Sequence, residues 1–100
     1  MYIGSTPTHK FILPSYATDV IKLRASYGQC DSVLFEKHLD DVRMDGNTIY
    51  IDLNVDETSK FVFGSNVQVQ MEAIMSNGKK LISPIYEVPV ERVLNTDILT

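Results

Sequence analysis

Apolar and polar residues alternate with a period of two along most of the chain, which is the spacing of half-buried β-strands. The alternation is clearest in residues 48–55 and 67–75, where every second side chain is apolar. The second of these stretches is long enough to be a central strand. The same spacing in residues 17–27 places four apolar side chains on one predicted inner face: Ile21, Leu23, Ala25 and Tyr27. These three stretches predict the strands that carry most of the core.

Shorter apolar stretches predict the remaining strands, at residues 9–13, 32–38 and 42–44 and from residue 81 onward. The first of them ends at Pro14, which lacks an N–H donor and therefore suits an edge strand. The alternation of the last stretch slips near Pro84. We expect an interrupted edge strand there, which continues through Leu94 and ends in a frayed terminus.

Turn signals separate the strands at residues 28–31, 45–47 and 64–66, and the Asn-Gly pair at residues 77–78 predicts a hairpin. The polar stretch 56–60 predicts a single helical turn, capped by Asp56, that carries the chain from one sheet to the other. After this turn we expect Phe61 and Phe63 to close the end of the core.

The strand pattern predicts an all-β fold, because no stretch of ten residues keeps a 3.6-residue period. About seven short antiparallel strands with frequent turns are typical of an immunoglobulin-like β-sandwich. The chain of 100 residues has the length of one domain, residues 1–100. A single Cys and no Trp exclude the Cys–Trp–Cys core of antibody domains, so the likeness is one of architecture. A small open β-barrel is the alternative.

Charge and cysteine content narrow the classes of partner. The chain has 9 Lys and Arg against 13 Asp and Glu, a net charge of −4, which argues against nucleic acid as a partner. Cys30 is the single cysteine, so no intramolecular disulfide can form, which fits a reducing cytoplasm. The first residues lack the pattern of a signal peptide, and no apolar run approaches a membrane span. We therefore expect a soluble protein without a membrane partner.

No motif in the sequence predicts catalysis or metal binding. The acidic stretch from Asp41 to Asp52 resembles a calcium loop only in part, since Arg43 occupies a ligand position. His9 and His38, without a second cysteine, fall short of a structural zinc set. The chain also lacks a nucleophile elbow and a glycine-rich phosphate loop. We predict a protein that is not an enzyme and that uses no cofactor or metal.

Four residues form the candidate interaction surface: Tyr50, Gln68, Gln70 and Glu72. Tyr50 lies on the polar side of its strand, so we expect its ring to be exposed. An exposed aromatic ring leaves sugar binding open, although tyrosine is common on strands for its β propensity alone. The other three line the outward side of the predicted central strand, a surface that either solvent or another protein can cover.

Several short runs carry a family resemblance that follows the chain in order: residues 6–14, 25–29, 34–37, 45–49, 56–58 with Phe61, and 67–70 followed by 77–78. Together they resemble a group of small uncharacterised proteins encoded near the tail structural genes of phages and prophages of Gram-positive bacteria. The resemblance covers nearly the whole chain. It brings no catalytic residue with it.

The resemblance implies a phage-encoded protein, made in the bacterial host cytoplasm, that belongs to the virion or assists its assembly. Our first hypothesis is a non-enzymatic structural or accessory protein, acting by contact with other phage structural proteins of the tail or baseplate, or with itself. An edge strand suits this role because it can dock on another sheet. The alternatives are a carbohydrate- or host-surface-binding module and a small phage-encoded inhibitor of a host protein.

Overall fold

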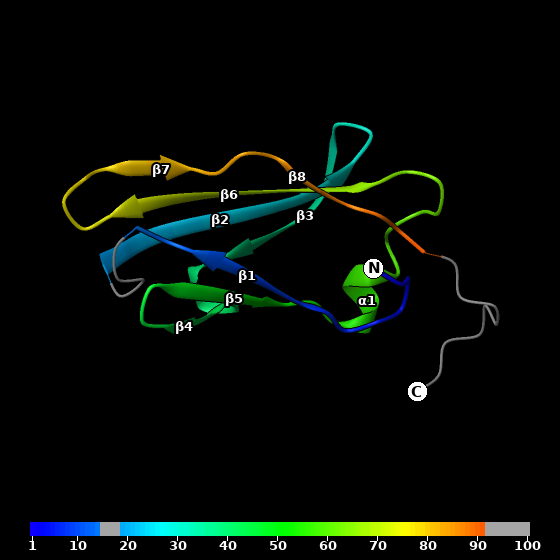
Figure 1. Cartoon of the computed structure of the whole chain (residues 1–100), viewed down its shortest axis with the longest axis horizontal. Helices are drawn as coiled ribbons and strands as arrows, with labels where there is room; N and C mark the ends of the chain where they lie inside the picture. Colours follow the sequence, from blue (N-terminus) through cyan, green and yellow to red (C-terminus); the bar gives the residue numbers. More distant parts are fainter. Residues whose placement is uncertain (15–18, 92–100) are drawn as a thin grey trace.

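Two antiparallel β-sheets face each other in the computed structural model, which describes residues 1–14 and 19–91 (Figure 1). One sheet has three strands in the order β1-β5-β4, and the other has five, with β3-β2-β6-β7 in order and β8 also paired with β6. The strands are β1 (Thr8–Ile12), β2 (Val20–Gln29), β3 (Ser32–His38), β4 (Arg43–Asp45), β5 (Thr48–Asp52), β6 (Val67–Met75), β7 (Lys80–Ile82) and β8 (Tyr86–Val88). The predicted all-β sandwich is confirmed, and the sheets do not close into a barrel.

The order of the strands is that of an immunoglobulin-like sandwich. Strands β1, β5 and β4 take the places of B, E and D, and strands β3, β2, β6 and β7 take those of C′, C, F and G. Strand A would lie beside β1 in this scheme. Within the described chain, residues before β1 contribute only an isolated parallel bridge between Tyr2 and Glu91. Among residues 1–14 and 19–91, the place beside β1 is therefore open, and this determines where the candidate site lies.

The core lies between the sheets and follows the predicted alternation. On β6, every second residue from Val67 to Met75 is buried, and Ile49 and Ile51 of β5 face them from the other sheet. Removing these side chains from water is the main driving force for bringing the two sheets together. The two clearest strands of the sequence therefore supply the centre of the core.

The predicted inner face of β2 is wrong at one position. The pairing of β2 with β6 shifts between Val20 and Lys22, so an extra residue enters the strand. Such a bulge reverses the side on which the following residues lie. Val20 is consequently buried, whereas Ile21 is 53 % exposed. Residues 17 and 18 of the predicted strand lie outside the described residues.

The turn after β2 is shorter than predicted. Strand β2 continues to Gln29, which pairs with Ser32 of β3, so only Cys30 and Asp31 form the turn. Both residues have positive φ, 52° and 62°, as a two-residue turn with the twist of its strands requires. Cys30 is exposed at this turn.

The helical turn between the sheets is confirmed as α1 (Val55–Thr58), but its cap is Asn54 rather than Asp56. The Asn54 side chain accepts a hydrogen bond from the Glu57 N–H at 2.8 Å, and the Glu57 carboxylate accepts one from the Asn54 N–H at 3.0 Å. This reciprocal pair is a capping box. A second short turn, the 3₁₀ helix Leu39–Asp41, connects β3 to β4. Neither this turn nor α1, nor any other helix in residues 1–14 and 19–91, has the length and hydrophobicity of a membrane span.

Phe61 closes the end of the core as predicted, but Phe63 does not. Phe61 is buried, whereas Phe63 is 58 % exposed. The buried Gln29 amide accounts for the difference, because it accepts from the Val62 N–H at 2.8 Å and donates to the Val62 and Ser65 carbonyls at 2.9 and 3.0 Å. These bonds hold the segment in a turn, so the alternation of a regular strand does not apply there.

The last predicted strand is interrupted, as expected, and forms β7 and β8. The β6–β7 hairpin turns at Asn77–Gly78, where the Met75 N–H donates to the Lys79 carbonyl at 2.8 Å. Between β7 and β8, the Ser83 hydroxyl accepts from the Met71 N–H at 2.9 Å and so replaces a ladder bond. The predicted continuation through Leu94 lies outside the described residues.

Candidate functional site

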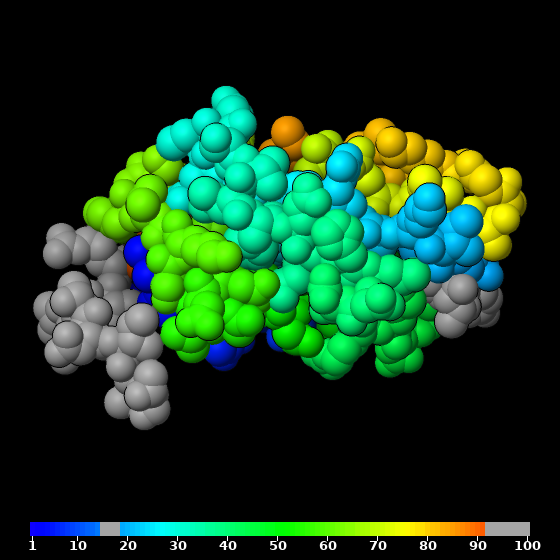
Figure 2. All heavy atoms as spheres, turned by 180° about the vertical axis from the view of Figure 1, so that it is seen from behind, coloured from blue at the N-terminus to red at the C-terminus, as the bar shows by residue number. Residues whose placement is uncertain are grey.

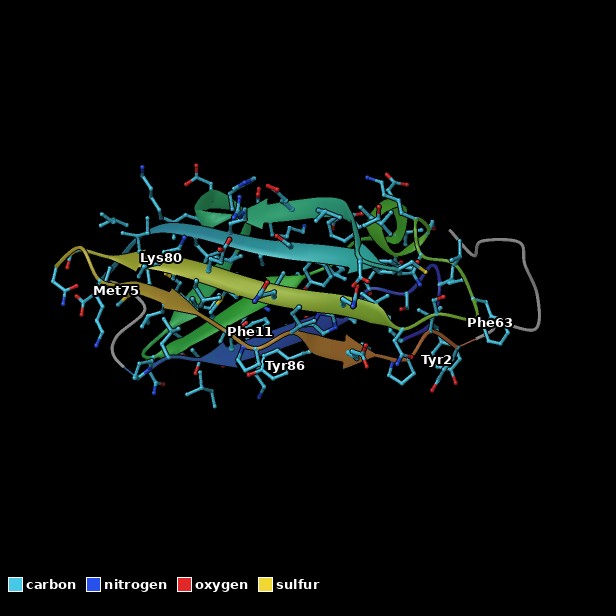
Figure 3. All side chains as sticks on the ribbon, turned by 90° about the horizontal axis from the view of Figure 1, so that it is seen from above. Tyr2, Phe11, Phe63, Met75, Lys80 and Tyr86 are labelled. Carbon is cyan, nitrogen blue, oxygen red and sulfur yellow. The ribbon has the colours of Figure 1, made fainter. Side chains whose placement is uncertain are left out.

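A groove of about 750 Å³ runs along one side of the sandwich, between the edge strand β1 and the edge formed by β7 and β8. We call it the β1 groove. It is lined by residues 8–14 of the first edge, 81–84, 86 and 88 of the second, and Val69 and Met71 of β6. Figure 3 shows Phe11 and Tyr86 side by side between the two edges. Their ring centroids are 5.8 Å apart in an edge-on arrangement, so the pair joins the two sheets across the groove.

The opposite side of the sandwich is covered by the chain. There, β3 and the segment that leads from it to β4 in the other sheet form the surface, which is cyan to green in Figure 2. Lys37 of β3 also forms an ion pair of 2.7 Å with Glu57 of α1, and both side chains are largely buried. The sandwich is therefore closed on this side and hollowed on the side of β1.

The β1 groove has an apolar floor and an apolar rim. Val69 and Met71 are buried beneath it, and Ile12, Ile82 and Tyr86 on its rim are 75 %, 58 % and 49 % exposed. Hydrophobic side chains that gather at a hollow on the surface are typical of interaction sites. Among the described lining residues, His9 and Lys10 are basic and none is acidic. This contrasts with the net charge of −4 of the whole chain.

His9 connects the groove to the core through Tyr27. Its Nδ1 lies 2.7 Å from the Tyr27 hydroxyl, and the two rings are stacked with centroids 5.6 Å apart. Burial raises the pKa of Tyr27, so the phenol stays protonated and remains hydrogen-bonded to Nδ1. Burial, and to a lesser extent the charge of the N-terminus, lower the pKa of His9. Lys10 therefore supplies the positive charge of the groove at neutral pH.

The lowered pKa of His9 predicts a pH-dependent stability. Below about pH 6.5, His9 binds a proton in the unfolded chain more readily than in the folded protein. The free energy of unfolding therefore falls as the pH decreases. We expect a decrease from about pH 7 to pH 5, with a slope below about 1.4 kcal/mol per pH unit, the limit for one proton. Urea unfolding followed by circular dichroism measures it.

Two glutamine variants serve as controls for this pH dependence. His9→Gln should remove most of the decrease, whereas His38→Gln should keep it, because the His38 side chain is exposed and lies outside the core. An unchanged slope in His9→Gln would contradict the assignment to His9.

The structure places Tyr50 of the predicted interaction surface on the outer side of the three-stranded sheet. Its ring is half-exposed, with the Arg43 guanidinium 5.2 Å from the ring centroid. Arg43 also donates to both carboxylate oxygens of Asp52, at 2.6 and 2.9 Å. These bonds, together with one from Thr8, hold the pKa of Asp52 well below its usual range. Tyr50 is thus part of a cross-strand arrangement of charged and aromatic side chains.

The other three predicted residues lie together on the outer side of β6, in the other sheet, and each has partners within the chain. The Gln68 side chain bonds with Asp31 at 3.0 and 3.1 Å, and Gln70 donates to the Ser83 carbonyl at 3.0 Å. Glu72 forms ion pairs with Arg24 and Lys80. The outer sides of the two sheets point in opposite directions. The structure therefore does not bring Tyr50 together with these three residues.

The sequence did not predict the groove. It predicted both of its edges, but a pattern along one strand does not show which two edges lie next to each other across a sandwich. The available signal was the pair Pro7 and Pro14, which bracket β1 and limit its pairing. Known proteins point to no site either: no protein-family model, curated protein or solved structure matches the chain.

Proposed function

We propose that this chain is a non-enzymatic structural or accessory protein of a phage or prophage, which acts by protein–protein contact at the tail or baseplate. The observation that carries the proposal is the β1 groove with its exposed rim of Ile12, Ile82 and Tyr86. The ordered family resemblance of the sequence supplies the phage context. A virion connector needs a stable sandwich and a surface to bind with, and the groove is such a surface.

The chemistry of the groove favours contact over catalysis. Its described lining is mainly apolar, and its histidine is already stacked on Tyr27 and hydrogen-bonded to it. Apolar walls with a few polar groups suit the side chains of another protein.

Co-sedimentation tests this proposal. The tagged chain is produced in a lysogen whose prophage is induced, and particles and assembly intermediates are separated on a gradient. We expect the chain in the particle fractions. Its absence from both particles and intermediates would refute the phage role.

Two matched substitutions show whether the groove makes the contact. Ile12→Asp places a charge on the groove rim, and Ile21→Asp places one on an exposed isoleucine of β2 outside the groove. We expect the first to lower the amount bound to particles at least tenfold, and the second to leave it unchanged. Equal effects of the two substitutions would argue against the groove.

A further inference from the structure

We propose that the β1 groove binds an extended strand of another protein, which adds to the free edge of β1 with apolar side chains toward the groove and an acidic side chain beside Lys10. This inference rests on the proposed function, since it describes how the contact is made. Four features carry it: the direction of the β1 backbone groups, the character of the other edges, the apolar walls and the charge.

The backbone of β1 presents hydrogen-bonding groups to the open side. Leu13 donates its N–H to the Asn47 carbonyl at 2.8 Å, and the Pro7 carbonyl accepts from the Leu53 N–H at 3.0 Å. The odd-numbered residues of β1 therefore direct their backbone groups toward β5. The even-numbered residues direct theirs away from it: Thr8, Lys10 and Ile12. Among the described strands none pairs with this edge.

The other edges of the sandwich are poorer templates. Strands β4, β7 and β8 are three residues long, and the edge of β7 and β8 is interrupted at Ser83 and Pro84. The edge strand β3 carries the charged segment 36–38, and charges on an edge discourage pairing. Strand β1 is an uninterrupted edge with a hollow beside it.

The walls of the groove suit the side chains of an added strand. Alternate residues of a strand point to the same side, so every second residue of the added strand would face Phe11, Val69 and Met71. A volume of about 750 Å³ is within the range of binding pockets in proteins. The added strand would occupy the place that strand A has in an immunoglobulin-like sandwich.

The positive charge of Lys10 indicates the chemistry of the partner strand. Lys10 is exposed beside the free edge, and a cross-strand neighbour lies about 5 Å away, so an acidic residue at that position is favoured. A second copy of this chain fits less well. Pairing β1 with itself about Lys10 would place two lysines opposite each other, and each copy has a net charge of −4. We therefore infer a different protein with an apolar and acidic strand.

Peptide selection tests the inference without phage particles. A library of random nine-residue peptides is panned against the immobilised full chain, and the selected peptides are synthesised for affinity measurement. We expect peptides in which apolar and polar residues alternate and which carry Asp or Glu. Lys10→Pro should weaken their binding at least tenfold, because proline removes an N–H of the free edge but none of those that face β5.

Two further measurements separate charge from backbone pairing. Lys10→Ala keeps the N–H, so its effect should be smaller than that of Lys10→Pro and confined to acidic peptides. On the unsubstituted chain, a bound peptide should slow the backbone hydrogen exchange of Thr8, Lys10 and Ile12. This second measurement does not depend on the folding of the proline variant.

Three results would overturn the inference: no enriched peptide, binding that Lys10→Pro leaves unchanged, or edge amides that a bound peptide does not protect. Self-association of the chain that Lys10→Pro abolishes would identify a second copy as the occupant and refute the chosen partner. If peptides bind but the chain is absent from phage particles, the peptide-binding site in the groove is supported and the phage role is refuted. If the chain co-sediments with particles but binds no peptide, the phage role is supported and strand addition at the groove is refuted.

Discussion

Tyr27→Ala is expected to lower the free energy of unfolding by about 4 kcal/mol, as large-to-small aromatic substitutions in cores do. Tyr27 is fully buried, and the rings of His9 and Phe35 are both stacked with its ring, at centroid distances of 5.6 and 5.0 Å. Phe35 in turn contacts Phe61. These rings come from both sheets and from the segment after α1, so the cavity left by Tyr27 would open at the centre of the sandwich.

The size of this effect is large relative to the stability of a typical domain, about 5–15 kcal/mol. Urea unfolding followed by circular dichroism measures it, and the alanine variant should unfold at a much lower urea concentration. Tyr27→Phe keeps the stacked ring but leaves His9 Nδ1 without its hydrogen-bond partner, for an expected loss of about 1 kcal/mol. A loss below about 2 kcal/mol for Tyr27→Ala would show that the neighbouring rings close the cavity.

The strands that the sequence predicted best are those whose alternation is not disturbed by backbone irregularities. In β5 and β6, apolar side chains at every second position determined both the strand and its buried side. The error at Ile21 has a local cause, because a bulge depends on how β2 pairs with β6 rather than on the residues of β2 alone. The exposure of Phe63 likewise depends on Gln29, which is distant in sequence.

The candidate site depended on information that no single strand contains. The sequence predicted β1 as an edge, and the structure adds that the edge of β7 and β8 lies across from it. The predicted surface residues Tyr50 and Gln70 share outward positions on their strands but belong to different sheets. The residue pattern of a strand predicts which of its side chains point outward. Whether outward side chains of two strands share a surface depends on the order of the strands in the sheets, which this pattern does not determine.

Gly28→Ala is expected to lower the free energy of unfolding by about 3 kcal/mol, at the upper end of the usual cost of overpacking. The pairing of β2 with β3 shifts between Tyr27 and Gly28, and at this bulge the backbone of β3 comes close. A Cβ at Gly28 would lie 2.4 Å from the Ser32 carbonyl oxygen and 3.3 Å from the Val33 Cα. Both contacts involve backbone atoms, which cannot turn away as a side chain could.

Neither strand can move away freely, because β2 is paired on its other side with β6, where Gly28 lies opposite Gln68. Urea unfolding again measures the loss, with Gly46→Ala as the matched control. Gly46 has a φ of +60° but no atom within 4 Å of an added Cβ, so its substitution should cost only about 1 kcal/mol of backbone strain. Equal losses for the two variants would mean that the β2–β3 bulge opens without cost, and that the close approach of β3 does not restrict position 28.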